Sequence, residues 1–231
     1  MSALPTLLLH DLRLQYRYGI HAAYGTVIVL YGAFLVFAGP YVPDWAVGLL
    51  IFSDPSALGF FFLGGLVLLE KGEGVRAALA ISPVSARAYL AAKTLTLTAL
   101  ALAAVVVLGL AKSGPVNWPL LLAGVALTSV FYIGIGVPIA LRFKTVNGYL
   151  LGSALFLAPV IIPAGLALLD PLPMALLAYP PVIQFRLTLV ALGYGTAGTL
   201  ELVLMLACAS IAAAAALLFA HHALQSELGR K

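Results

Sequence analysis

Residues 199–220 read TLELVLMLACASIAAAAALLFA, an apolar run in which Glu201 is the one charged side chain. A helix needs about 20 mostly apolar residues to cross the hydrocarbon core of a bilayer. The whole chain has a similar composition: 63% of its residues are hydrophobic, 9% are charged and the mean hydropathy is +1.12. Soluble domains carry roughly 25% charged residues. The sequence therefore predicts an all-α integral membrane protein.

Six apolar stretches account for nearly all of the 231 residues. They predict one transmembrane domain over residues 1–231, with no room for a separate soluble domain. The second stretch is interrupted at Ser53-Asp54-Pro55, and the fifth is kinked, if helical, by two prolines. The predicted spans cover residues 20–38, 47–69, 90–111, 119–141, 149–169 and 199–220.

Residues 1–18 predict an amphipathic helix on the membrane surface. Its apolar side chains share one helical stripe: Leu4, Leu8, Leu12 and Tyr16. Its polar and charged side chains fall mainly on other faces: His10, Asp11, Arg13 and Arg17. The alternative is an ordinary basic leader before the first span.

The basic residues orient the spans. If the N-terminus is inside, the inner segments hold ten of the twelve lysines and arginines, and the outer segments hold two, Lys112 and Arg186. Cytoplasmic loops carry the excess of basic residues in membrane proteins. We therefore expect a multi-pass protein of the cell membrane with both termini in the cytoplasm.

Residues 170–198 lie between the fifth and sixth predicted spans and contain four prolines. Their apolar runs, 174–177 and 182–192, are too short to cross a bilayer. They predict an extracytoplasmic hairpin of re-entrant or interfacial helices, broken at Pro180-Pro181. A seventh span here is the alternative, and it would place the C-terminal Arg230 and Lys231 outside.

Residues 70–85 read EKGEGVRAALAISPVS and form part of a polar stretch between the second and third spans. Gly72 and Gly74 permit a sharp turn, and about two helical turns follow. Ser82 is then expected to cap a new helix with Pro83 at its first position. The prediction is a short, exposed cytoplasmic helix, which would either dock a partner protein or serve only as an elbow between spans.

Few polar groups lie within the apolar stretches. Asp54 could relay a proton or bind a cationic substrate, or it could cap the helix that begins at Pro55 near the outer end. Glu201 has the same ambiguity. His21, His221 and His222 lie near span ends and are expected to be interfacial residues. We therefore predict no catalytic, cofactor-binding or metal-binding residue.

Three stretches resemble a known family. Residues 68–93, LLEKGEGVRAALAISPVSARAYLAAK, resemble the first cytoplasmic loop of exporter-type ABC transporter permeases. Residues 51–74, IFSDPSALGFFFLGGLVLLEKGEG, and residues 141–151, LRFKTVNGYLL, are similar to the branch known as fluoroquinolone export permeases. The resemblance extends over the whole chain in length, span count and loop order.

The resemblance implies a permease that dimerises, as a homodimer or heterodimer, and docks on a separate ABC ATPase subunit to export a small molecule, in this branch a drug. The implied docking element is the coupling loop at residues 70–89, with Glu70, Lys71, Glu73, Arg76, Ser82 and Pro83. The chain has no G-x-x-x-x-G-K-[ST] stretch to cradle phosphates. ATP would therefore be bound and hydrolysed on the partner subunit, and this chain would not be an enzyme.

Two other classes of function are alternatives. A proton-coupled secondary transporter would use Asp54 as its relay and would need no partner chain, but inverted repeats that would support it are not visible. An intramembrane enzyme needs paired polar groups at matched depth, and the sequence offers only isolated ones. The low number of basic residues, placed between apolar runs, argues against a nucleic-acid partner.

Overall fold

The structure, a computed structural model, describes residues 3–53, 58–75 and 84–227. These residues form helices joined by short connections, and no strand occurs among them. The predicted all-α class is therefore confirmed. The helices are α1 (Ala3–Arg17), α2 (Ile20–Ala38), η1 (Gly39–Tyr41), α3 (Asp44–Ile51), α4 (Leu58–Gly72), α6 (Ala86–Ala111), α7 (Trp118–Ala140), α8 (Val146–Ile161), η3 (Ile162–Leu168), η4 (Met174–Ala178), α9 (Pro180–Ala191) and α10 (Thr199–Glu227).

Within the described residues, five helical segments are long and apolar enough to cross a membrane. They correspond to the first, third, fourth, fifth and sixth predicted spans. Several extend beyond the predicted bounds, because a helix continues past the apolar run into its polar flanks. The segments are Ile20–Tyr41, Ala86–Ala111, Trp118–Ala140, Val146–Leu168 and Thr199–Glu227.

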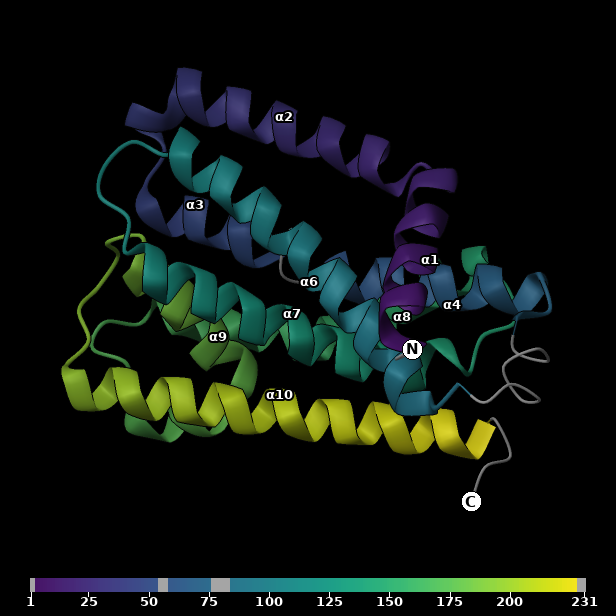
Figure 1. Ribbon diagram of the computed structural model, residues 1–231. Helices are drawn as coiled ribbons and strands as arrows, with labels where there is room; N and C mark the ends of the chain where they lie inside the picture. Colours follow the sequence, from purple (N-terminus) through teal and green to yellow (C-terminus); the bar gives the residue numbers. More distant parts are fainter. Residues whose placement is uncertain (1–2, 54–57, 76–83, 228–231) are drawn as a thin grey trace.

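Two shorter helices replace the second predicted span. α3 has 8 residues and α4 has 15, so neither alone reaches the length of about 20 residues that a crossing requires. They follow one another along the bundle (Figure 1). The predicted interruption falls between them, and Asp54 and Pro55 themselves lie outside the described residues. Of the six predicted crossings, the second would therefore need α3 and α4 together.

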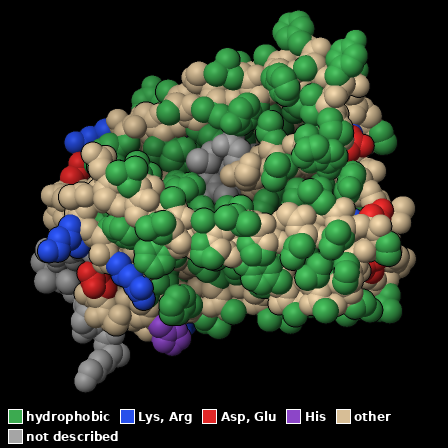
Figure 2. Space-filling model, turned by 180° about the vertical axis from the view of Figure 1, so that it is seen from behind, with side chains coloured by type: hydrophobic (Ala, Val, Ile, Leu, Met, Phe, Trp, Pro, Cys, Tyr) green, Lys and Arg blue, Asp and Glu red, His purple; other side chains and the backbone are tan. Residues whose placement is uncertain are grey.

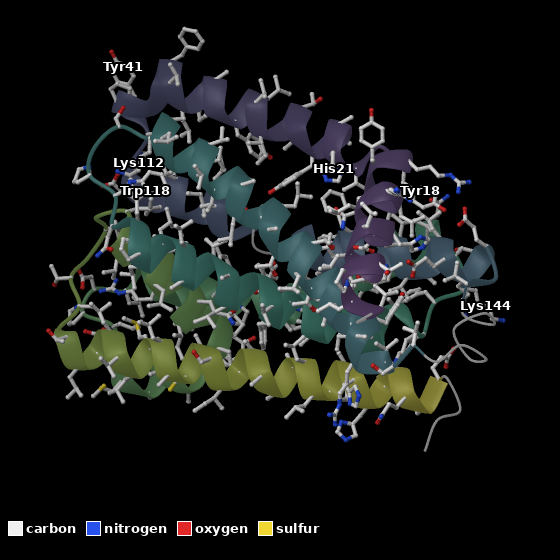
Figure 3. The ribbon with its side chains drawn as sticks, in the orientation of Figure 1. Tyr18, His21, Tyr41, Lys112, Trp118 and Lys144 are labelled. Carbon is white, nitrogen blue, oxygen red and sulfur yellow. The ribbon has the colours of Figure 1, made fainter. Side chains whose placement is uncertain are left out.

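The long helices run side by side, and α1 lies across them near the end of the bundle that also holds the C-terminus (Figure 1). Figure 2 shows a broad band of apolar side chains on one face, with acidic and basic side chains gathered at its two ends. Tyr41, Lys112 and Trp118 lie at one end, whereas Tyr18 and Lys144 lie at the other (Figure 3). Lys112 and Lys144, predicted on opposite sides of the membrane, are thus at opposite ends of the bundle.

α7 is the central helix and packs against α4, α6, α9 and α10. Two glycines allow the close approach. A β-carbon on Gly134 would lie 2.6 Å from the backbone carbon of Ala216 in α10, and one on Gly136 would lie 3.1 Å from the ring of Phe60 in α4. Both glycines therefore serve helix packing. Pro138 lies within α7, which continues to Ala140.

The predicted hairpin at residues 170–198 contains η4 and α9. α9 begins at Pro180, so the chain bends just before the proline pair, which occupies the first turn where prolines are tolerated. Ten of the 12 residues of α9 are buried, and α9 packs against α3, α7, α10 and η3. Other helices therefore enclose α9 within the bundle.

Arg186 on α9 fastens this hairpin, although only 1% of the residue is exposed. Its Nη2 lies 2.9 Å from Oδ1 of Asp170, and its guanidinium also donates to the backbone carbonyls of Ala167, Leu169 and Thr196. Gly195 has φ of +73°, and a β-carbon there would meet the guanidinium at 2.8 Å. Glycine is thus required both by the backbone conformation and by the arginine.

Candidate functional site

α1 turns a partly polar face toward the bundle. Asp11, Leu14 and Gln15 are buried, whereas Leu12 and Tyr16 of the predicted stripe are 44% and 80% exposed. Residues Ala3–Arg17 form a helix, and its place on the membrane surface stays a prediction. Asp11, which was predicted to lie off the apolar stripe, packs against the bundle. Asp11 and Gln15 share this face because they are four residues apart on a helix.

Lys93 lies about two turns inside α6, and only 2% of it is exposed. A buried ammonium group is costly unless it is paired. Its Nζ lies 2.8 Å from Oδ1 of Asp11 in α1 and 2.8 Å from Oε1 of Glu70 in α4. Both carboxylates are also buried. One lysine therefore joins three helices.

Neighbouring side chains satisfy the remaining carboxylate oxygens. The Tyr89 hydroxyl donates to Oε2 of Glu70. Gln15 Nε2 donates to Oδ2 of Asp11 at 2.8 Å, and the Thr96 hydroxyl donates to the same oxygen. We call these six side chains the Lys93 cluster: Asp11, Gln15, Glu70, Tyr89, Lys93 and Thr96. Each carboxylate oxygen in the cluster has a partner, as a buried charge requires.

A second, more exposed contact joins the C-terminal end of α1 to the turn that follows α4. The hydroxyl of Tyr18, just after α1, donates to Oε1 of Glu73 at 2.6 Å, and Nη2 of Arg17 lies 3.4 Å from the same oxygen. The hydrogen bond to Glu73, and secondarily burial, raise the pKa of Tyr18 because both favour the neutral phenol. Glu73 stands in the turn after α4, so α1 is tied to α4 and to the start of the coupling loop.

The Lys93 cluster joins α1, α4 and α6 through buried charges. Removing one member of a buried ion pair typically destabilises a protein by about 3–5 kcal/mol, because it leaves an uncompensated charge. α1, α4 and α6 are therefore expected to move together at this end. Among the described residues, no group of three or more His, Cys, Asp and Glu side chains is placed to hold a metal ion.

Comparison with known sequences identifies the family of this chain. The sequence model of the fluoroquinolones export permease protein family matches residues 2–226. The chain belongs to this family. Two curated relatives, both named fluoroquinolones export permease protein and both from strains of Mycobacterium tuberculosis, are 32% identical over 135 residues.

The aligned region covers 58% of this chain and 49% of each relative, so the chain spans about half the length of the curated relatives it matches. No solved structure matches the chain. The family and the apolar helices together make the chain a multi-pass membrane protein of a transport family.

The structure places some of the docking residues implied by the family resemblance and not others. Lys71 and Glu73 are exposed, and Glu70 is buried in the Lys93 cluster. Any part that Glu70 plays in docking must therefore act through the position of the loop. Arg76, Ser82 and Pro83, with the predicted short helix, lie outside the described residues, as does Asp54.

The start of the third span differs from the prediction. α6 begins at Ala86, and its cap is Ser85, whose hydroxyl accepts a hydrogen bond from the backbone N–H of Ala88 at 3.1 Å. The helix thus begins four residues before the predicted bound of the span at residue 90. The cap predicted at Ser82, with Pro83 at the first helical position, lies outside the described residues.

Sequence reasoning placed Glu70 in the coupling loop, but it missed the contacts of Glu70 and Asp11 with Lys93. The available signal was Lys93 itself, a charge two turns inside an apolar helix. The Asp11–Gln15 pair, four residues apart beside apolar Leu14, was a second one. Nothing local in the sequence links these two signals.

Proposed function

We propose that the chain is the permease subunit of an ATP-driven ABC exporter, which forms the translocation pathway as a dimer and is moved by a separate ATPase subunit. In this proposal α3 and α4 together make the second of six crossings, both termini are cytoplasmic, and residues 1–231 are one transmembrane permease domain. ATP is hydrolysed on the partner chain.

The Lys93 cluster is the observation that carries the proposal. It connects the end of α4 to the early part of α6, and these helices flank the predicted coupling loop at residues 70–89. A force on that loop would reach both helices at once, and also α1 through Asp11. A motor that acts from outside the membrane needs such a rigid attachment, because soft connections would absorb its movement.

The ATPase would touch the exposed part of the loop. Lys71 and Glu73 offer charged side chains at this surface, and we include Arg76, Ser82 and Pro83 in the docking segment. At the opposite end, η4 and α9 would form the extracytoplasmic hairpin, with α9 re-entering the bundle. The substrate class is taken from the relatives' names: a fluoroquinolone or a drug of similar character.

The proposal predicts that the chain co-purifies with an ABC ATPase from its native membrane and supports ATP-dependent uptake of a fluoroquinolone into inverted vesicles. The variant Lys71→Ala/Glu73→Ala should reduce both co-purification and uptake. Glu201→Ala, a carboxylate removed at the opposite end, is the matched control and should change neither. Equal co-purification for the two variants would exclude Lys71 and Glu73 from docking.

The proton-coupled alternative is tested with the chain alone. Liposomes that contain only this chain and carry a proton gradient should show no drug transport. Transport under those conditions, lost on Asp54→Asn, would overturn the proposed need for an ATPase.

A further inference from the structure

A groove lies between α6 and α10. It encloses about 590 Å³, which is within the range of about 300–1,000 Å³ that small-molecule sites occupy. Its walls are almost entirely apolar: Leu90, Ala91 and Leu95 from α6, and Ala214, Leu217 and Leu218 from α10. The groove is open along one side, so a molecule can enter it laterally.

One end of this groove is polar. Arg87 and His221 line it and also line an adjoining cavity of about 180 Å³, together with Ser85 and Gln225. Arg87 is exposed and makes no ion pair or hydrogen bond with another described residue. His221 is 9% exposed, and its ring nitrogens have no hydrogen-bond partner in the described part of the chain. Arg87 thus faces this cavity with no counter-charge among the described residues, and the His221 imidazole lies beside it.

The polar and apolar parts are arranged along the helix axes. Leu95 is eight residues beyond Arg87 on α6, about 12 Å deeper at a rise of about 1.5 Å per residue. Ala214 lies seven residues before His221 on α10, about 10 Å in the same direction. The polar end sits at the end of the bundle where α6 begins, and the apolar walls extend from it toward the middle of the apolar band. A lipid molecule has the same arrangement, with a polar headgroup at one end and a hydrocarbon chain that extends from it.

The polar end favours an anion. Arg87 is the second residue of α6, where the unpaired N–H groups of the first turn add partial positive charge. Arg87 and His222 are basic neighbours of His221, and the described residues that line the groove and the adjoining cavity include no Asp or Glu. A phosphate group would supply the missing counter-charge and accept hydrogen bonds from both side chains.

We propose that the groove between α6 and α10 binds an anionic phospholipid, with its phosphate at Arg87 and His221 and an acyl chain along Leu90, Leu95 and Leu217. A second copy of the chain is the rival occupant, because it could cover the apolar walls. A copy bringing only apolar surface would bury Arg87 without a counter-charge, which is unfavourable. An anionic lipid supplies both a counter-charge for Arg87 and an acyl chain that covers the apolar walls.

The test uses the full chain purified in detergent and exposed to equal amounts of phosphatidylglycerol and phosphatidylcholine with identical acyl chains. Native mass spectrometry counts the retained lipids. The wild type should prefer phosphatidylglycerol. Arg87→Gln should reduce retained phosphatidylglycerol about fivefold, the effect of one basic contact with an anionic lipid, and leave phosphatidylcholine unchanged. Arg142→Gln, an exposed arginine after α7, is the matched control.

The apolar part is tested with Ala214→Phe, which fills the groove, against Ala215→Phe on the adjacent face. Ala214→Phe should reduce retention of both lipids. The proposal is overturned if neither lipid is preferred, if Arg87→Gln behaves like Arg142→Gln, or if inorganic phosphate displaces the lipid at equal concentration. Loss of a dimer in Ala214→Phe with unchanged lipid retention would assign the groove to a second copy instead.

Discussion

The ammonium group of Lys93 sits between two carboxylates that come from different helices. Such a site has an asymmetric energy. Replacing all three charges with neutral groups of similar shape is often tolerated, whereas removing one charge leaves the others buried without compensation. The main cost of replacing Lys93 therefore comes from the two carboxylates that stay buried without a cation, and less from the contacts that Lys93 itself loses.

Lys93→Met should lower the free energy of unfolding by about 3–5 kcal/mol, because two carboxylates then remain buried without a cation. The neutral triple variant Asp11→Asn/Glu70→Gln/Lys93→Met should recover part of that loss. Thermal melting in detergent measures both, with Lys144→Met as the exposed control. A triple variant no more stable than Lys93→Met would show that charge compensation is not what the cluster supplies.

The individual charges of this cluster are visible in the sequence, but their association is not. Asp11 was placed on a polar face of its helix because local periodicity sorts residues only into apolar and polar sides. Its partner Lys93 is 82 residues away, and helical periodicity carries no information about which polar face meets which helix. Positions of single charges were therefore predictable, and the contact between them was not.

At the scale of the helices, glycine residues decide how closely two helices can pack. Gly134 has no room for a side chain, since a β-carbon would lie 2.6 Å from the backbone of α10. Gly65 in α4 has no atom within 4 Å of that position. The same substitution at the two sites should therefore have opposite effects.

Gly134→Ala should destabilise the protein by about 1–3 kcal/mol, because α7 and α10 must separate to admit the methyl group. Gly65→Ala should be neutral or stabilise by up to about 1 kcal/mol, because alanine lowers the entropy lost when a helix interior folds. Thermal midpoints of the two variants check this directly. A stable Gly134→Ala protein would contradict the close contact.

Helices were more predictable than their ends. The apolar runs fixed the five long segments, because desolvation in a bilayer leaves few alternatives to a helix. The third span was predicted to begin at residue 90, whereas α6 begins at Ala86 with Ser85 as its cap, and the sequence offers Ser82 as a second possible cap. Choosing between two suitable caps requires knowing where the helix packs, and this depends on the rest of the bundle.

At the scale of the whole molecule, the charge distribution and the helix arrangement agree. Residues predicted on one side of the membrane gather at one end of the bundle, as Lys112 and Lys144 illustrate (Figure 3). The side of the cell that each end faces rests on the excess of basic residues. One predicted crossing, the second, is divided between two helices, α3 and α4.

Single cysteines in a Cys208→Ser background test that crossing. Tyr41 and Lys71 are exposed and lie before α3 and at the end of α4, so Tyr41→Cys should react with an impermeant maleimide in intact cells, and Lys71→Cys only in inverted vesicles. Ser113→Cys and Lys144→Cys are controls for the two sides. Labelling of residues 41 and 71 from one side would show that α3 and α4 do not cross together.

The long sequence separation within the Lys93 cluster has a consequence for biosynthesis. The ribosome adds Asp11 82 residues before Lys93, roughly 4–16 s earlier at about 5–20 residues per second. During that interval the Asp11 carboxylate lacks the buried ammonium group with which it pairs in the folded protein, and it is most stable in contact with water. α1 is therefore expected to wait at the edge of the bilayer and to dock only after α6 has been inserted, which makes its attachment a late step in assembly.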